Sequence, residues 1–207
     1  MEPQQEQPNK PPTVFITNGE YTDLTRRNIT EKTCKKWGYQ IATIDGEQAQ
    51  VANYRSRDGK LVGQKIRFAN KSFKVRGELV GLYGQHLWRD GGRRVVVTEG
   101  EIDALSVSQA FENKWPVVSI PHGAQSGKNH VAQALDWLER FDEVIFMFDM
   151  DDPGRSGATE CAALLSPGKA KIAELPLKDP NDMLVANRSK DLVDAIWQAR
   201  DYRPDGI

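Results

Sequence analysis

The stretch VIFMFDMDDPGRS, Val144 to Ser156, decides the fold of this chain. Its first five residues are apolar, and Asp149, Asp151 and Asp152 follow them directly before a Pro-Gly turn signal. An apolar run bounded in this way predicts a buried strand in a parallel sheet that is covered by helices on both faces. The acids then lie at the edge of the sheet where α/β proteins bind ligands. They predict a divalent-metal site, and the alternative is a group of acids that cap the next helix.

Strands and helices alternate along the second half of the chain. Apolar runs predict strands at 94–98, 117–120, 143–148 and 171–175. Helical spacing predicts helices at 101–111, 131–140, 157–165 and 192–199, whereas the polar stretch 122–130 is predicted to be a loop. This alternation indicates βαβ crossovers. We therefore expect an α/β domain with a four-stranded parallel sheet over residues 91–201.

The first half predicts a small α+β subdomain at residues 13–90. Its expected elements are a helix at 31–37 and strands at 39–44, 48–54, 61–68, 72–75 and 78–83. The segment 51–76 contains one acid and eight basic residues, namely Arg55, Arg57, Lys60, Lys65, Arg67, Lys71, Lys74 and Arg76. Such a basic stripe suits the binding of a polyanion, although a solvated basic hairpin has the same composition.

The composition is that of a globular protein with room for a substantial core, with 39% apolar and 28% charged residues among 207. Residues 1–12, rich in Gln and Pro, predict a disordered linker, and 202–207 the start of another. No apolar run approaches the roughly 20 residues of a membrane helix, and no secretory signal is evident, so we expect an intracellular protein. Cys34 and Cys161 lie far apart, which excludes a cysteine-rich zinc site and favours free thiols.

Carboxylates follow three of the predicted strands. Glu99 and Asp103 come after the first, Asp149 and Asp151 after the third, and Asp179 after the fourth. Each group alone could be a helix cap or a favourable first-turn acid, and we assign that role to Glu101. Three groups at one sheet edge are better explained by Mg²⁺ or Mn²⁺, since hard cations prefer carboxylate oxygens and bind substrate phosphates. Two such ions would support phosphoryl or nucleotidyl transfer.

The segment GAQSGK, residues 123–128, superficially resembles a phosphate-binding loop. Its glycines are one residue too close for that motif, and Asn129 stands where a Ser or Thr would bind magnesium. We predict a flexible loop beside the site, with Lys128 as a candidate contact to phosphate. His122 is a candidate substrate contact, and the alternative for it is a histidine at a helix entry.

The motifs TEGEIDALS, SIPHGAQSGKNH, FMFDMDDPGRSG and KDPNDML resemble those of the TOPRIM domain in the phage and mitochondrial primase-helicase group. LTRRNITEKTCKKWGY and GQKIRFANKSFKVRG are similar to the N-terminal subdomain of the same RNA-polymerase module. The resemblance implies a DNA primase, a nucleotidyltransferase that makes short RNA primers from ribonucleoside triphosphates on single-stranded DNA. It also implies a replicative DNA polymerase as a partner and action in the cytoplasm of a bacterial host cell.

The resemblance further implies roles for individual residues. Glu99 would be a metal ligand or the general base for the 3′-hydroxyl, Asp149 and Asp151 would bind metal, and Asp103 and Asp179 would support them. Nucleoside triphosphate and the template-primer duplex would face the basic stripe at Lys65, Arg67, Lys71 and Lys74.

The cysteine-rich zinc module and the fused helicase of such primases do not occur in this sequence. We therefore expect a catalytic fragment whose parent chain carries them, and which recognises its start site poorly. A TOPRIM nuclease, a topoisomerase and a nucleic-acid-binding module with vestigial acids are the alternatives.

Overall fold

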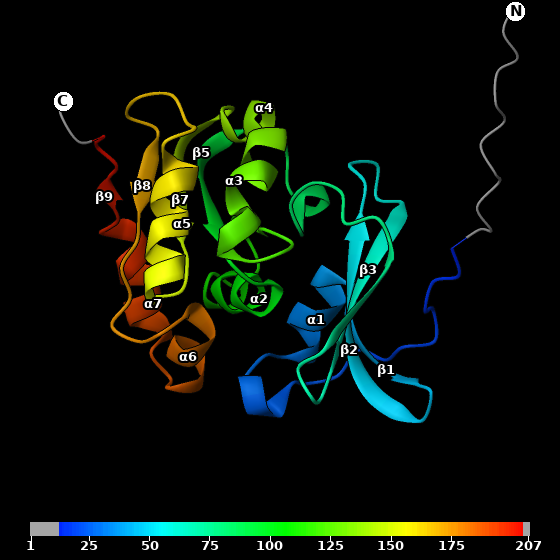
Figure 1. The fold of residues 1–207 in the computed structure, drawn as a ribbon. Helices are drawn as coiled ribbons and strands as arrows, with labels where there is room; N and C mark the ends of the chain where they lie inside the picture. Colours follow the sequence, from blue (N-terminus) through cyan, green and yellow to red (C-terminus); the bar gives the residue numbers. More distant parts are fainter. Residues whose placement is uncertain (1–12, 205–207) are drawn as a thin grey trace, which may run out of the picture.

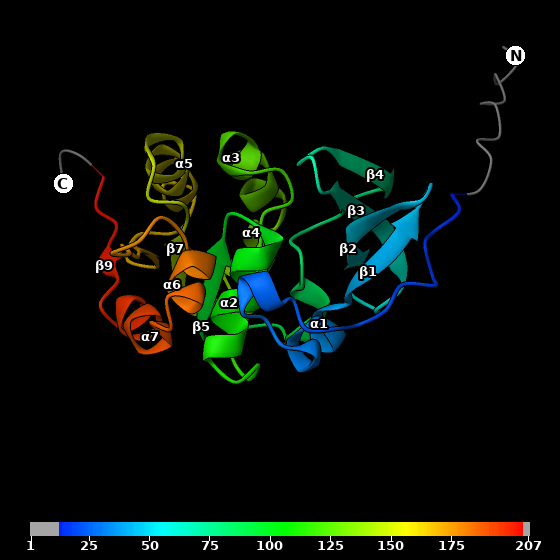
Figure 2. The same cartoon turned by 90° about the horizontal axis from the view of Figure 1, so that it is seen from below.

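The protein, described by a computed structural model over residues 13–204, contains two β-sheets that lie side by side (Figures 1 and 2). The linker predicted at 1–12 and the last three residues of the linker predicted at 202–207 lie outside the described range. One hydrophobic core runs through both halves, because Trp37 and Tyr54 of the first half pack in the same cluster as Val96 and Phe146 of the second. Within the described residues, every helix is too short or too polar to cross a lipid bilayer.

The first sheet is an antiparallel meander of four strands, in the order β1-β2-β3-β4. Its strands are β1 (Tyr39–Ile44), β2 (Glu47–Arg55), β3 (Leu61–Phe68) and β4 (Phe73–Gly77). The short helix η1 (Thr25–Arg27) and α1 (Glu31–Trp37) precede it, and η2 (Gln85–Leu87) follows it. The strand predicted at 78–83 is wrong, because this segment is irregular, with φ of +69° at both Gly77 and Gly81. Left-handed backbone of this kind ends the pairing.

The register of β3 and β4 decides which side chains face the second half. Lys65 pairs with Val75, and Arg67 pairs with Phe73, so these four side chains share one face of the sheet. Ile66 pairs with Lys74, and both belong to the opposite face. That outer face packs as a separate small core with Ile16, Ala42, Ile44, Ala49, Val51 and Phe68.

The second sheet has the order β6-β5-β7-β8-β9. Its parallel strands are β5 (Gly92–Thr98), β6 (Val117–Ser119), β7 (Phe141–Met147) and β8 (Ala170–Ile172), so the prediction of a parallel α/β sheet is confirmed. A fifth strand, β9 (Arg200–Asp201), joins β8 antiparallel. It was not predicted, because two polar residues carry no strand pattern.

Helices cover both faces of this sheet. Contacts group α2 (Glu101–Ala110), α6 (Pro180–Val185) and α7 (Ser189–Trp197) on one side. On the other side, α3 (Ala124–Gln133) and α5 (Asp152–Ala162) pack together, and α4 (Leu135–Leu138) leads into β7.

The loop predicted at 122–130 is wrong, because Ala124 onward is helical. Small residues let α3 pack closely against α5. A methyl group added at Gly157 of α5 would lie only 2.8 Å from Cβ of Ala124, so the two helices can approach this closely only because residue 157 is glycine.

Candidate active site

A cleft of about 610 Å³ lies between the two sheets. One wall is the inner face of β3 and β4, and the other is formed by residues that follow the carboxyl ends of β5, β6, β7 and β8. The predicted site residues that line it are Lys65, Arg67, Lys71, Glu99, Asp103, His122, Asp149 and Asp179. The cleft therefore has a basic wall opposite an acidic one.

Glu99 is fixed by backbone groups of two other segments. Its Oε1 accepts a hydrogen bond of 3.2 Å from the amide of Ala124, and its Oε2 accepts one of 3.2 Å from the amide of Asp149. The carboxylate thus joins the first residue of α3 to the segment after β7. Its orientation is set by the backbone, which is the condition for a group that must be placed accurately.

The neighbouring carboxylates are close enough to disturb one another. Burial, and then repulsion from Glu99 and Asp179, raises the pKa of Asp149 to about 6, although Lys178 opposes this from 3.6 Å. Burial also raises the pKa of Asp103 well above its ordinary value, with Asp179 and Asp149 contributing next. The acidic wall therefore concentrates negative charge that a cation would stabilise.

Two of the acids also cap helices. Asp151 accepts a hydrogen bond of 2.9 Å from the amide of Gly154 at the start of α5, and Asp179 accepts one of 2.7 Å from Asp182 in α6. Asp179 lines the cleft, whereas Asp151 is exposed and does not, although its charge adds to the raised pKa of Asp149. Capping and a role in the site are compatible, since a carboxylate has several acceptor positions.

The donor chemistry of the acidic wall fits a hard divalent cation, because its groups are carboxylates that repel one another. In residues 13–204, no three His, Cys, Asp or Glu side chains are arranged to hold a metal ion as they stand. Mg²⁺ needs only one or two protein carboxylates, because waters and substrate phosphates complete its ligands.

The basic wall contains part of the predicted stripe. Lys65, Arg67 and Lys71 line the cleft, and Arg27 of η1 joins them. Lys74 does not, because the alternation of β4 places it on the outer face, where its ammonium lies 5.2 Å from the centre of the Phe68 ring.

The two candidates around the predicted phosphate loop lie in different places. His122 lines the cleft, and its ring centre lies 5.3 Å from that of His130. Lys128 is an exposed residue of α3 and is absent from the cleft lining.

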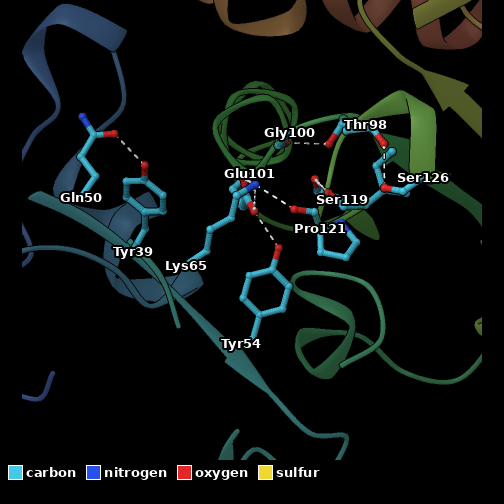
Figure 3. A network of polar contacts seen from close by, with 12 residues as sticks. Tyr39, Gln50, Tyr54, Lys65, Thr98, Gly100, Glu101, Ser119, Pro121 and Ser126 are labelled. Carbon is cyan, nitrogen blue, oxygen red and sulfur yellow. Dashed lines mark hydrogen bonds and ion pairs between the residues drawn. The ribbon is translucent and has the colours of Figure 1, made fainter. Parts of the chain in front are cut away.

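A largely buried ion pair joins the two walls and could not be anticipated from the sequence. Glu101, interpreted from sequence as a first-turn acid, accepts a hydrogen bond of 2.6 Å from the Tyr54 hydroxyl and lies 2.9 Å from the Lys65 ammonium (Figure 3). Lys65 also donates to the carbonyl of Pro121 at 2.8 Å. Tyr54 and Lys65 come from the first sheet, so no local pattern around Glu101 signals these partners.

A second polar link crosses the base of the cleft through Asn181, which is 1% exposed. Its amide exchanges hydrogen bonds with Arg27, accepting at 3.1 Å and donating to the Arg27 carbonyl at 3.0 Å. Its backbone amide donates to Asp103 at 3.3 Å. Asn181 therefore connects η1 to an acid of the site.

Comparison with known proteins decides the family. A family model described as the N-terminal α+β fold of bacteriophage T7 DNA helicase/primase matches residues 19–77, and a Toprim-like model matches residues 96–184. The crystal structure of the primase fragment of bacteriophage T7 primase-helicase is 40% identical, with a TM-score of 0.86, over 95% of this chain and 82% of that one. The chain belongs to the T7-type primase family.

Other relatives extend beyond the T7-type primase region. The DNA helicase/primase of Enterobacteria phage T3 is 43% identical over 92% of this chain, which spans only 34% of that relative. A Twinkle homolog of Arabidopsis thaliana is 28% identical over 85% of this chain, which spans 27% of it. The DnaG catalytic core has a TM-score of 0.67 at 15% identity and so shares the fold of this T7-type primase.

Proposed function

We propose that this chain is the catalytic module of a DNA primase, which joins ribonucleotides into short RNA primers on a single-stranded DNA template. In each step, the 3′-hydroxyl of one nucleotide attacks the α-phosphate of the next ribonucleoside triphosphate, and pyrophosphate leaves. The observation that carries this proposal is the cleft in which carboxylates face a row of cations. A triphosphate needs cations on its outer oxygens, and the reacting centre needs ordered acids.

The relatives support this assignment. A solved structure of the bacteriophage T7 lagging-strand DNA polymerase includes a primase chain that is 41% identical over 92% of this one. In that assembly the polymerase interacts with primase domains of two subunits, which are bound to an RNA/DNA hybrid and dTTP. By analogy we propose a replicative DNA polymerase, and zinc-binding and helicase domains of a longer parent chain, as partners. The site of action would be the cytoplasm of the infected bacterium.

Toprim-like domains usually bind divalent metal ions. We assign Glu99, Asp149 and Asp151 as the ligands of two divalent ions, either Mg²⁺ or Mn²⁺. Asp103 and Asp179 would support these ligands. When bound, such ions stabilise charge on the attacking and leaving oxygens.

The chain's own groups would then position the reactants. Glu99, held by two amides, can accept the proton of the 3′-hydroxyl. Arg67, Lys71 and His122 lie along the cleft where they can contact phosphate oxygens. Lys65 is engaged with Glu101 and Pro121, so its contribution is to fix the cleft wall as well as to add positive charge. Such contacts read the phosphate backbone and carry little sequence information.

The test is incubation with a single-stranded template, labelled ribonucleotides and Mg²⁺. New di- to tetranucleotides are expected, and Asp149→Asn should reduce their formation by about 100-fold or more. Asp142→Asn is the matched control, because Asp142 is an exposed acid at the opposite end of β7. Shortened template without new product would instead favour a nuclease, and binding without either product would favour a nucleic-acid-binding module.

A further inference from the structure

Phe73 is a large apolar side chain that remains 52% exposed, although it lines the cleft between the two walls. It belongs to neither of the two hydrophobic clusters. It is also the first residue of β4, an edge strand that, in the described part of the chain, pairs only with β3. Burial within this chain therefore does not account for an aromatic ring at this position.

Two cations of the basic wall lie beside the Phe73 ring. The Lys65 ammonium is 5.0 Å and the Arg67 guanidinium 5.6 Å from the ring centre. Both come from β3, and Arg67 is the cross-strand partner of Phe73. An exposed aromatic ring among cations is the combination that single-stranded nucleic-acid sites use, since the ring stacks on a base while the cations attract phosphate.

The neighbouring side chains leave room for a planar ligand. Val75, two residues further along β4 on the same face, is 48% exposed and also lines the cleft. Phe73 and Val75 thus form an apolar strip on the basic wall of the cleft. A base on this strip would have the Arg67 guanidinium within reach of its phosphates.

We propose that the Phe73 ring stacks on a nucleobase bound in the cleft, and that this contact adds affinity with little preference among bases. The base belongs either to the template strand or to the incoming ribonucleotide. This inference rests on the proposed primase function, which supplies the ligand. The alternative is that Phe73 only stabilises the β3–β4 pairing through its contact with Arg67.

The experiment measures binding separately from synthesis. The probes are a single-stranded oligodeoxynucleotide that contains 2-aminopurine and, in a second arm, 2-aminopurine riboside triphosphate with Mg²⁺. Stacking quenches 2-aminopurine fluorescence. Phe73→Ala should remove the quenching and weaken binding of one probe by about 5- to 100-fold. Phe73→Trp should retain both, and the probe affected identifies the source of the base.

Two variants make the result specific. Phe73→Leu keeps the apolar volume but has no ring, so it should behave like Phe73→Ala. Val80→Ala changes another exposed apolar residue, 51% exposed and outside the cleft, and should bind like the parent.

The proposal would be overturned if Phe73→Ala and Phe73→Leu bound and quenched both probes like the parent. It would also be overturned if Phe73→Trp weakened probe binding as much as Phe73→Ala does. A parent protein that binds and quenches but makes no primer would refute the primase function while leaving the stacking contact intact.

Discussion

Replacing Glu101 should destabilise the whole protein, because it removes the acid of the Lys65–Glu101 ion pair that joins the two walls of the cleft. The side chains of Lys65 and Glu101 are only 15% and 11% exposed. In Glu101→Ala, the Lys65 ammonium keeps the Pro121 carbonyl but loses its counter-charge, and the Tyr54 hydroxyl loses its acceptor.

The expected cost follows from these contacts. Breaking one side of a buried pair costs about 3 to 5 kcal/mol. Partial exposure of both groups favours the lower end, about 3 kcal/mol. For a chain of this length, that loss corresponds to a melting temperature lower by about 6 to 12 °C. Glu101→Gln should cost about half as much, since its amide oxygen can still accept from Tyr54.

The assay is thermal and urea unfolding followed by circular dichroism, with primer synthesis measured below the transition. Glu112→Ala is the control, because Glu112 and its partner Lys114 have side chains 73% and 68% exposed. An exposed pair of this kind contributes about 1 kcal/mol or less. A Glu101→Ala variant no less stable than the control would refute the view that this pair joins the two halves.

Three further predictions concern the acids, the cations and the helix packing. The pKa of Asp149 is raised to about 6 in the folded state, so without metal the free energy of unfolding should fall by on the order of 2 kcal/mol as pH rises from about 4 to 7. Asp149→Asn should reduce this decline, which is measured by the melting temperature across pH. Arg67→Ala or Lys71→Ala should lower the slope of log affinity for single-stranded DNA against log salt by about 0.7, whereas Lys74→Ala on the outer face should leave it unchanged in anisotropy titrations. Gly157→Ala should cost about 1 to 3 kcal/mol in urea unfolding, because its methyl group would force α3 away from α5.

The parallel sheet could be predicted from sequence because its strands are buried on both sides. Val95 and Val96 of β5, and Val144 and Ile145 of β7, are all buried, and neighbours along a strand point to opposite faces, so each strand is a continuous apolar run. α3 could not be predicted, because its sequence contains Gly127 and several polar residues with low helix propensity. Tertiary packing overrides that propensity, since a methyl group at Gly127 would lie 3.0 Å from Ile120 and 3.2 Å from the Cys161 sulfur.

The candidate site, too, could be predicted only where a local sequence pattern signals it. The acids could be proposed from sequence because each follows a strand, and parallel strands end at one edge. The basic stripe includes Lys65, Arg67 and Lys71, which line the cleft, and Lys74, which does not. The placement of Lys74 depends on the register of β3 and β4, which puts its side chain on the outer face. The pairing of Glu101 with Lys65 spans 36 positions, so it could not be read from either segment alone.

Among the described residues, β4 leaves one side of its backbone without a strand partner. Free amides and carbonyls of this kind can template the addition of a strand from another molecule, which is how edge-to-edge aggregation begins. Lys74 and Arg76 project from the outer face of β4, and like charges on two approaching copies would repel. These two cationic residues, which do not reach the cleft, therefore oppose edge-to-edge pairing, and neutralising both should promote self-association.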